Sequence, residues 1–138
     1  MSAEANKETA RRLVEEVFNQ RQLQNLQEFA APDFTNHDPK GHITRGAQNL
    51  MGFHSGFSDL HFTIAQILGE GDLVAIQWTA TGTHQQSLAH MTSEFAGPAT
   101  GRSVTMTGMW LFRFEGSKVA EVWNHWDRHH LLGQISAK

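Results

Sequence analysis

The spacing of apolar residues changes near residue 60, and this change constrains the fold more than any other feature of the sequence. Before it, apolar residues recur every three or four positions, which is typical of a helix with one buried face. After it, they alternate with polar residues, which is typical of strands with one buried face. The helical patterns cover residues 3–20, 22–29 and 46–57, and the alternating stretches cover residues 60–68, 73–84, 103–114 and 119–126.

Helices followed by strands predict an α+β fold, in which the N-terminal helices cover one face of a mostly antiparallel sheet. We expect the sheet to curve into a conical barrel that encloses a cavity open at one end. A last helical pattern spans residues 128–135, with Asp127 as its expected N-cap. A length of 138 residues predicts one domain, 1–138, with a single core.

The composition argues against several classes of protein. A net charge of -3 leaves no basic surplus for phosphate backbones, so nucleic acid is not an expected partner. The chain has no cysteine, hence no disulfide or thiolate chemistry, which fits a reducing compartment. No apolar run approaches the roughly 20 residues that span a bilayer, so no membrane segment is expected. We therefore expect a cytoplasmic protein.

Strand alternation sorts the side chains, because residues two apart share a face. On the last three alternating stretches, 73–84, 103–114 and 119–126, the even-numbered face is the more apolar, and we expect it to line the cavity. The residues expected there are Trp78, His84, Met106, Trp110, Asn124 and Trp126. On the predicted helix 46–57, Phe53, His54 and Phe57 are expected to add to a substrate-binding wall. Inward indoles suit a flat hydrophobic ligand, although large aromatics also fill ordinary cores.

The opposite face of the sheet carries Thr, Met, Leu and Trp123 and is too apolar in places for full exposure. A partner subunit would cover such a face most simply, so we expect a homodimer formed through the outer side of the sheet.

Residues 85–102 contain polar residues, Gly and Pro without a sustained period. Long loops of this kind are often functional, and this one is a candidate lid over the cavity.

Three segments of the chain together resemble one family. They are FTNHDP at 34–39, GFSDLHFTIAQILGEGDLVAIQWTATGTH at 56–84 and PATGRSVTMTGMWLFRFEGSKVAEVWNHWDRHHLLGQI at 98–135. The family they resemble is that of the SnoaL-like polyketide cyclases, within the nuclear transport factor 2-like and ketosteroid isomerase-like fold. The resemblance implies ring closure of a polyketide by intramolecular aldol condensation, without metal or organic cofactor. In such cyclases an aspartate removes the acidic proton, and a histidine helps to stabilise the enolate oxygen.

Two positions of this chain depart from that pattern. Alignment on Arg113 and on the turn at 116–118 places the family's aspartate at Asn124 and its histidine at Trp110. An amide is no base, and an indole only donates, so neither residue can take the role implied by the resemblance. Asn124 can still hold a carbonyl or enolate oxygen by hydrogen bonding.

A replacement base has to come from another ionisable group. His84, on the expected inner face, and His37, in the FTNHDP segment beside the expected cavity mouth, are the candidates, because the ordinary imidazole pKa of ~6.5 suits proton transfer. Either could equally be a hydrogen-bonded histidine of the wall. His125, His129 and His130 straddle a change from strand to helix and match no ligand motif, so no metal site is expected.

The leading hypothesis is a cofactor-free enzyme that acts on a hydrophobic carbonyl compound by enolate chemistry, of aldol or isomerase type. The alternative is a non-catalytic protein that binds a hydrophobic small molecule. A third hypothesis is epoxide or ester hydrolysis, which would need a carboxylate or an imidazole to activate water inside the cone.

Overall fold

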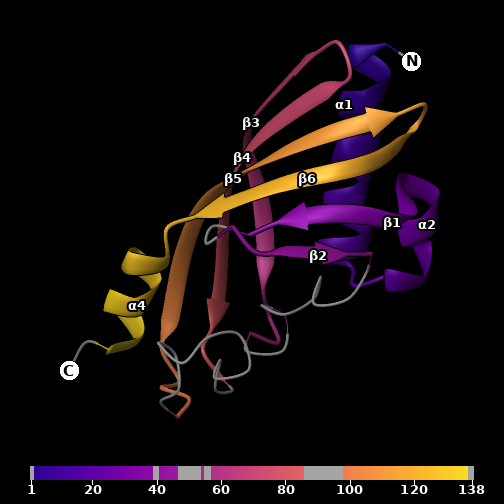
Figure 1. Cartoon of the computed structure of the whole chain (residues 1–138). Coiled ribbons are helices and arrows are strands. Elements are labelled where there is room, and N and C mark those ends of the chain that lie inside the picture. The colour runs from indigo at the N-terminus through magenta and orange to yellow at the C-terminus, as the bar shows by residue number, and fades with distance from the viewer. Residues whose placement is uncertain (1, 39–40, 47–53, 55–56, 86–97, 137–138) are drawn as a thin grey trace.

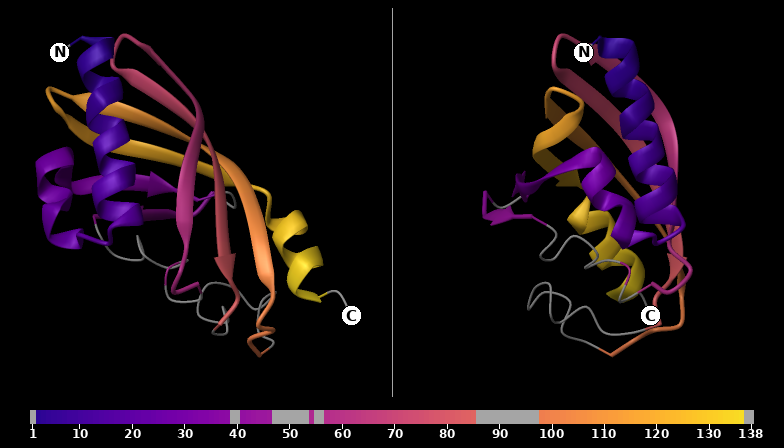
Figure 2. Two further views of the ribbon diagram at one scale, coloured as in Figure 1. Left: turned by 180° about the vertical axis from the view of Figure 1, so that it is seen from behind. Right: turned by 90° about the vertical axis from the view of Figure 1, so that its right-hand side faces the viewer.

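A six-stranded sheet with helices against one face forms the body of the molecule (Figure 1). The computed structural model describes residues 2–38, 41–46, 54, 57–85 and 98–136. The expected α+β fold, with a curved, mostly antiparallel sheet and N-terminal helices, is confirmed. Figure 2 shows α1 lying along the long strands near one end of the sheet, and α4 at the other end.

The first helical stretch consists of two differently wound parts. It begins with α1 (Ala3–Arg12), where the side chain of Ser2 accepts a hydrogen bond from the Ala5 amide at 3.1 Å. It continues as η1 (Leu13–Asn19), a π-helix, so the single helix predicted for 3–20 is more loosely wound in its second half. The residues that η1 buries are Leu13, Val14, Val17 and Phe18.

Two short helices then lead to the sheet. They are the 3-10 helix η2 (Leu23–Asn25) and α2 (Leu26–Phe29), which together account for the helical pattern at 22–29. The first strand begins at Ala30, directly after α2.

The strands form one sheet with the order β2-β1-β6-β5-β4-β3. Neighbouring strands are antiparallel except β1 and β6, which run parallel. The bounds are β1 (Ala30–His37), β2 (Ile43–Arg45), β3 (His61–Glu70), β4 (Leu73–Thr83), β5 (Ser103–Glu115) and β6 (Lys118–Trp126).

Two strands differ from the expectation based on local pattern. The eight-residue strand β1 lies outside the alternating stretches and includes the segment 34–39 up to His37. The three-residue strand β2 has no sequence signal at all, because it is too short to show alternation. Both are fixed by pairing along the sheet, β1 with β6 and β2 with β1. Most of the predicted helix 46–57 and of the expected lid 85–102 lies outside the described residues.

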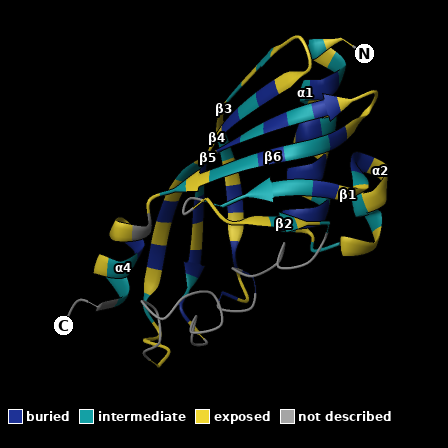
Figure 3. Ribbon diagram, viewed as in Figure 1, coloured by how far each residue is buried: buried dark blue, intermediate teal, exposed yellow. Residues whose placement is uncertain are grey.

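Buried and exposed residues alternate along β4 and β5, as Figure 3 shows by colour. The buried side chains of these strands pack with those of η1 into one hydrophobic cluster. The sheet face toward the helices is therefore called the inner face here, and the opposite one the outer face.

The C-terminal helix α4 (Arg128–Ser136) begins at the N-cap expected from the sequence. Oδ1 of Asp127 accepts a hydrogen bond from the His130 amide at 2.9 Å, which confirms the capping role. Gln134 binds the helix to β5, because its side chain pairs with both the amide (2.8 Å) and the carbonyl (2.7 Å) of Thr105.

Candidate functional site

The two positions singled out by the family resemblance lie side by side on the sheet. Trp110 of β5 is directly opposite Asn124 of β6 in the strand register. Opposite residues of an antiparallel pair point to the same face, and here it is the inner one. Trp110 is buried, and so is Oδ1 of Asn124. A shared ligand could therefore contact both side chains.

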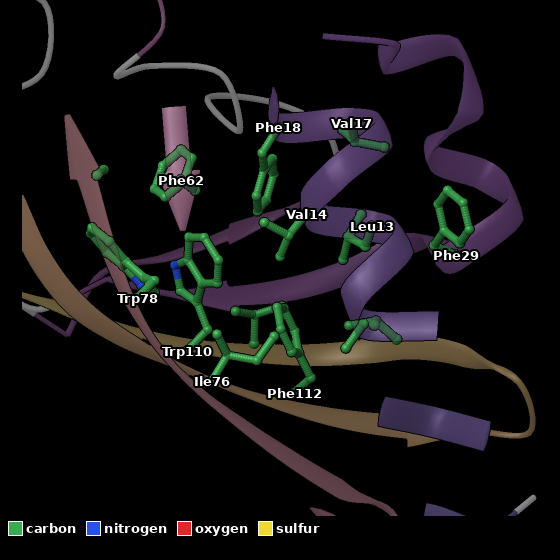
Figure 4. Packing of buried hydrophobic residues seen from close by; sticks show 14 of the residues in the cluster. Leu13, Val14, Val17, Phe18, Phe29, Phe62, Ile76, Trp78, Trp110 and Phe112 are labelled. Carbon is green, nitrogen blue, oxygen red and sulfur yellow. The ribbon is translucent and has the colours of Figure 1, made fainter. Parts of the chain in front are cut away.

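Four aromatic rings from four elements meet beside this pair (Figure 4). Trp78 of β4 stacks on Trp110 with ring centroids 5.0 Å apart. Phe62 of β3 lies 5.1 Å from Trp78 and 5.1 Å from Trp110. Phe18 of η1 lies 5.1 Å from Trp110 on the helix side. The inner face at this level thus carries a cluster of buried aromatic rings that pack against one another.

Gly108 makes room for one of these rings. It lies opposite Trp78 on one side and opposite Trp126 on the other. A Cβ at this position would come within 2.4 Å of Cζ2 of Trp78, so the indole lies directly over the bare backbone of β5. The missing side chain of Gly108 is what allows Trp78 to lie flat beside Trp110.

Several buried polar atoms of the inner face have no hydrogen-bond partner among the described residues. They include Oδ1 of Asn124 and Nε1 of Trp78. Each such atom costs about 1–3 kcal/mol of folding free energy. Unsatisfied groups that a fold retains are characteristic of places where a ligand or water supplies the partner. Asn6, on α1, also has a buried Oδ1 without a partner in the described part of the chain.

Asn36 is a residue of this face that the sequence reasoning missed. It lies opposite Val122 in the parallel pair of β1 and β6, so it shares the inner face with Asn124, two positions further along β6. Its Oδ1 is buried and lacks a partner in the region described. The signal was present in the alternation of the segment, because the buried Phe34 lies two residues before it.

His54 is buried and has one ring nitrogen with no partner among the residues that the structure describes. Its Nε2 donates to the carbonyl oxygen of Phe18 at 2.8 Å, while its Nδ1 is buried and unpartnered within the described residues. The ring lies 6.3 Å from Phe18 and 6.0 Å from Phe62. Burial lowers the pKa of His54, and the positive charge of Arg21 acts in the same direction. The imidazole is therefore held in its neutral form.

His84 is buried on the inner side, at the end of β4, as expected from alternation. Its Nδ1 accepts a hydrogen bond from the Thr100 amide at 3.2 Å and lies 3.1 Å from the hydroxyl of the same residue. The Nδ1 lone pair is thus shared with Thr100, and in the neutral ring the proton is on Nε2. His84 also contacts Phe57, with ring centroids 5.7 Å apart.

His37 lies on the outer face of the sheet, and not beside Asn124. Its ring stacks on Trp123 at 5.1 Å, and Nε2 is 2.6 Å from Oε2 of Glu121. Arg113 binds the other oxygen of Glu121 at 3.0 Å. The hydrogen bonds from His37 and from Arg113 lower the pKa of Glu121. This face follows from parity, because His37 is one residue after the inward Asn36.

The other expected wall residues are placed as follows. Met106 and Phe57 are fully buried, and Trp126 is partly buried and packs against the same hydrophobic cluster. Phe53 lies outside the described residues.

A groove of about 520 Å³ runs between the helical stretch α1–η1 and the edge strand β3. Arg11, Glu15 and His61 are among the side chains that line it. Within the described parts of the chain, no three His, Asp or Glu side chains gather as metal ligands would. The same parts contain no helix that is both long and apolar enough to cross a bilayer.

The comparison with known families decides which one this geometry represents. The model of the SnoaL-like polyketide cyclases matches residues 8–135. The chain belongs to this family. No curated protein matches the sequence significantly.

Solved structures of the family's fold match nearly the whole chain. A protein of a Jannaschia species, described as a candidate SnoaL-like polyketide cyclase, superposes with a TM-score of 0.85 at 22% identity, over 99% of this chain and 94% of that one. AclR of Streptomyces galilaeus, described as a candidate hydroxylase, gives 0.84 at 24% identity, over 99% of each chain. IdmH of Streptomyces antibioticus, described as a candidate polyketide cyclase, gives 0.79 at 28% identity, over 96% of this chain and 99% of that one.

Proposed function

We propose that this SnoaL-like protein acts on a hydrophobic carbonyl compound through an enolate, in a reaction of aldol or isomerase type that needs neither metal nor organic cofactor. The observation that carries the proposal is the pairing of stacked indoles with unpartnered buried polar atoms on one face. Trp78 and Trp110 are 5.0 Å apart, and Oδ1 of Asn124 and Nε1 of Trp78 are without partners in the described residues. A flat carbonyl compound offers an apolar surface for the indoles and polar atoms for the unpartnered groups.

Asn124 is proposed to bind the oxygen that becomes negative. Its carboxamide has N–H groups as well as Oδ1, and an N–H donor aimed at an enolate oxygen is worth more in a water-excluded site than in water. Trp110, directly opposite on β5, offers an apolar ring surface and an indole N–H. Neither residue removes a proton, so the base has to be another side chain, and the sequence points to histidine.

Of the two histidines expected from the sequence to be the base, His84 is the one that lies on the inner side of the sheet. Because its Nδ1 shares a lone pair with the Thr100 amide, His84 would first have to break that hydrogen bond to accept a proton there. While Nδ1 is bonded to Thr100, His84 is better suited to donate a hydrogen bond from Nε2 than to act as a base. His37 is bound to Glu121 on the outer face and has no part in the proposed reaction.

The test of the function combines binding and enolate formation on one probe, the bicyclic ketone 2-tetralone. Binding is measured by quenching of tryptophan fluorescence. Enolate formation is measured by proton NMR as exchange of the C1 hydrogens for deuterium in D2O. We expect saturable binding and exchange faster than in buffer. Exchange at the buffer rate despite saturable binding would refute catalysis.

Asn124→Leu tests the proposed oxygen contact. Leucine keeps the approximate volume and removes the amide, so we expect the exchange rate to fall by about 100-fold, as for other single donors to an oxyanion. The control is Asn6→Leu, which removes another buried amide, on α1, and is expected to leave the rate per folded molecule unchanged.

The second candidate function is binding without catalysis. It is favoured by the sequence alignment, which is expected to place an amide, Asn124, and an indole, Trp110, at the aspartate and histidine positions of the cyclases. The double variant Asn124→Asp with Trp110→His restores that pair. Aldol cyclisation that appears only in the double variant would identify the native chain as a binding protein.

A homodimer through the outer face remains part of the proposal. One row of this face crosses all six strands in register and is largely apolar. Its members are Leu68, Ala75, Leu111, Trp123, His37 and Ile43. Leu68 and Ile43 are 69% and 56% exposed in the single chain, which favours coverage by a partner.

A further inference from the structure

His54 differs from the other inward histidine in which ring nitrogen is occupied. A carbonyl oxygen can only accept a hydrogen bond, so the 2.8 Å contact with Phe18 requires the proton to be on Nε2. In the neutral ring Nδ1 then carries a bare lone pair, and this atom is buried without a partner among the described residues. The contact with Phe18 thus sets the tautomer of His54, and no described residue uses its basic nitrogen.

The surroundings of His54 connect this nitrogen to the proposed site. Phe62 is the shared neighbour, because its ring lies 6.0 Å from His54, 5.1 Å from Trp78 and 5.1 Å from Trp110. The rings of Phe18 and Phe62 both lie near the imidazole, so a ligand in the place of one of them would adjoin His54. A planar compound in the place of the Phe62 ring would face the imidazole on one side and the stacked indoles on the other.

We propose that His54 is the general base of this protein and that Nδ1 accepts the proton from the carbon next to the substrate carbonyl. The proposal rests on the proposed enolate chemistry and assigns the group that this chemistry lacks. In an imidazole with one N–H held by a carbonyl, the hydrogen bond fixes the ring orientation and stabilises the imidazolium that forms.

The step balances without a co-reactant. The C–H bond breaks, its proton goes to Nδ1, and its electron pair moves to the carbonyl oxygen, which becomes an enolate held by the Asn124 amide. In an aldol reaction the enolate carbon then bonds to a second carbonyl carbon, and the oxygen of that carbonyl takes the proton back from Nδ1. In an isomerisation the same proton returns to another carbon. His54 is neutral again at the end of either route.

The decisive variant is His54→Gln. A glutamine can donate an N–H toward the Phe18 carbonyl in place of Nε2, but it has no basic nitrogen. We expect the exchange of 2-tetralone to slow by about 100-fold or more, with the dissociation constant within about threefold of the wild type. The matched control is His61→Gln, the same change at an exposed position of β3 next to Phe62, which is expected to leave the exchange unchanged.

A second measurement uses the unaltered protein. In ¹⁵N NMR of histidine-labelled protein, His54 should be protonated at Nε2 and not at Nδ1. The protonation of His54 is followed by the same NMR signals as pH decreases, and the rate of 2-tetralone exchange is measured over the same pH range. The exchange rate should fall with the same midpoint pH as the protonation of His54. Among the described residues, Arg21 is a charged side chain whose positive charge lowers the pKa of His54.

The outcomes separate this proposal from the proposed function. Exchange that is catalysed by the wild type and equally by His54→Gln would overturn the role of His54 and leave the enolate chemistry standing. Protonation of His54 at Nδ1, or a rate that follows a group with another midpoint, would also overturn that role alone. Binding without any catalysed exchange in the wild type would overturn both.

Discussion

At the scale of single residues, Gly108 has the closest packing on the inner face. A Cβ there would meet the Trp78 ring at 2.4 Å and the backbone oxygen of His125 at 2.6 Å. Gly108→Ala should therefore displace the indole and lower the free energy of unfolding by about 1–3 kcal/mol. Urea denaturation measures the loss, and tryptophan fluorescence reports the moved ring.

The control for Gly108→Ala is a glycine with open space around it. A Cβ on Gly133 in α4 would have no atom within 4 Å. Gly133→Ala should stabilise the protein by about 0.5–1 kcal/mol, because alanine favours a helix interior. Equal effects of the two substitutions would contradict the close packing of Trp78 over β5.

His54 predicts how stability depends on pH. Its pKa lies below the ordinary value of 6.5 because burial opposes the charged form. As pH decreases below 6.5, the unfolded chain binds a proton that the folded protein does not, so the free energy of unfolding falls. Urea denaturation between about pH 7 and pH 5 should show this fall in the wild type and a smaller one in His54→Gln. An identical pH dependence in both proteins would contradict the prediction.

The carboxylates with lowered pKa act in a different range. Asp59 and Glu121 have ordinary values of 3.8 and 4.5, and their hydrogen bonds lower the pKa of each. Their contribution to stability is present above those values and is lost only in more acidic solution. A fall in stability just below pH 6.5 is therefore not caused by these carboxylates, and the part of it that His54→Gln removes is assigned to His54.

At the scale of elements, α4 is held by its cap, by the hydrogen bonds of Gln134 to β5 and by the buried Leu131. Asp127→Ala removes the acceptor for the His130 amide and should cost about 0.5–2 kcal/mol of stability. Thermal unfolding followed by circular dichroism measures the loss. Asp127→Ser keeps a capping oxygen and should retain most of the stability. If Asp127→Ser lost as much stability as Asp127→Ala, the capping hydrogen bond would not be the reason that Asp127 stabilises the protein.

The elements also show where local pattern is sufficient and where it is not. Alternation predicts the bounds of β4 and β5 and the inward side of Trp78 and Trp110, since it depends only on neighbours along the strand. It does not predict the π-helical winding of η1 or the parallel pairing of β1 with β6, because both depend on tertiary contacts. The strand β2 is missed for the same reason.

At the scale of the whole molecule, the apolar outer face predicts the oligomeric state. Met109 lies on the outer face of β5, two residues before Leu111 of the apolar row, and is 50% exposed. We expect light scattering to show twice the mass of one chain for the wild type, and the mass of one chain for Met109→Glu. Leu23→Glu, which adds the same charge at an exposed leucine of η2, should remain a dimer. A monomeric wild type would refute the proposed interface.

The sequence by itself determined the α+β order, the faces of the long strands, the Asp127 cap and the family, because each rests on local periodicity or on a motif. It also predicts that Asn124 and Trp110 stand at the aspartate and histidine positions of the cyclases, which stays a prediction. Only the tertiary structure shows which ring nitrogen of His54 and of His84 is engaged by a neighbour. The proton position in His54 depends on the Phe18 carbonyl, 36 residues away, and that in His84 on Thr100, 16 residues away. Spacing along the chain carries no information about such contacts, since folding alone brings these atoms within hydrogen-bonding distance.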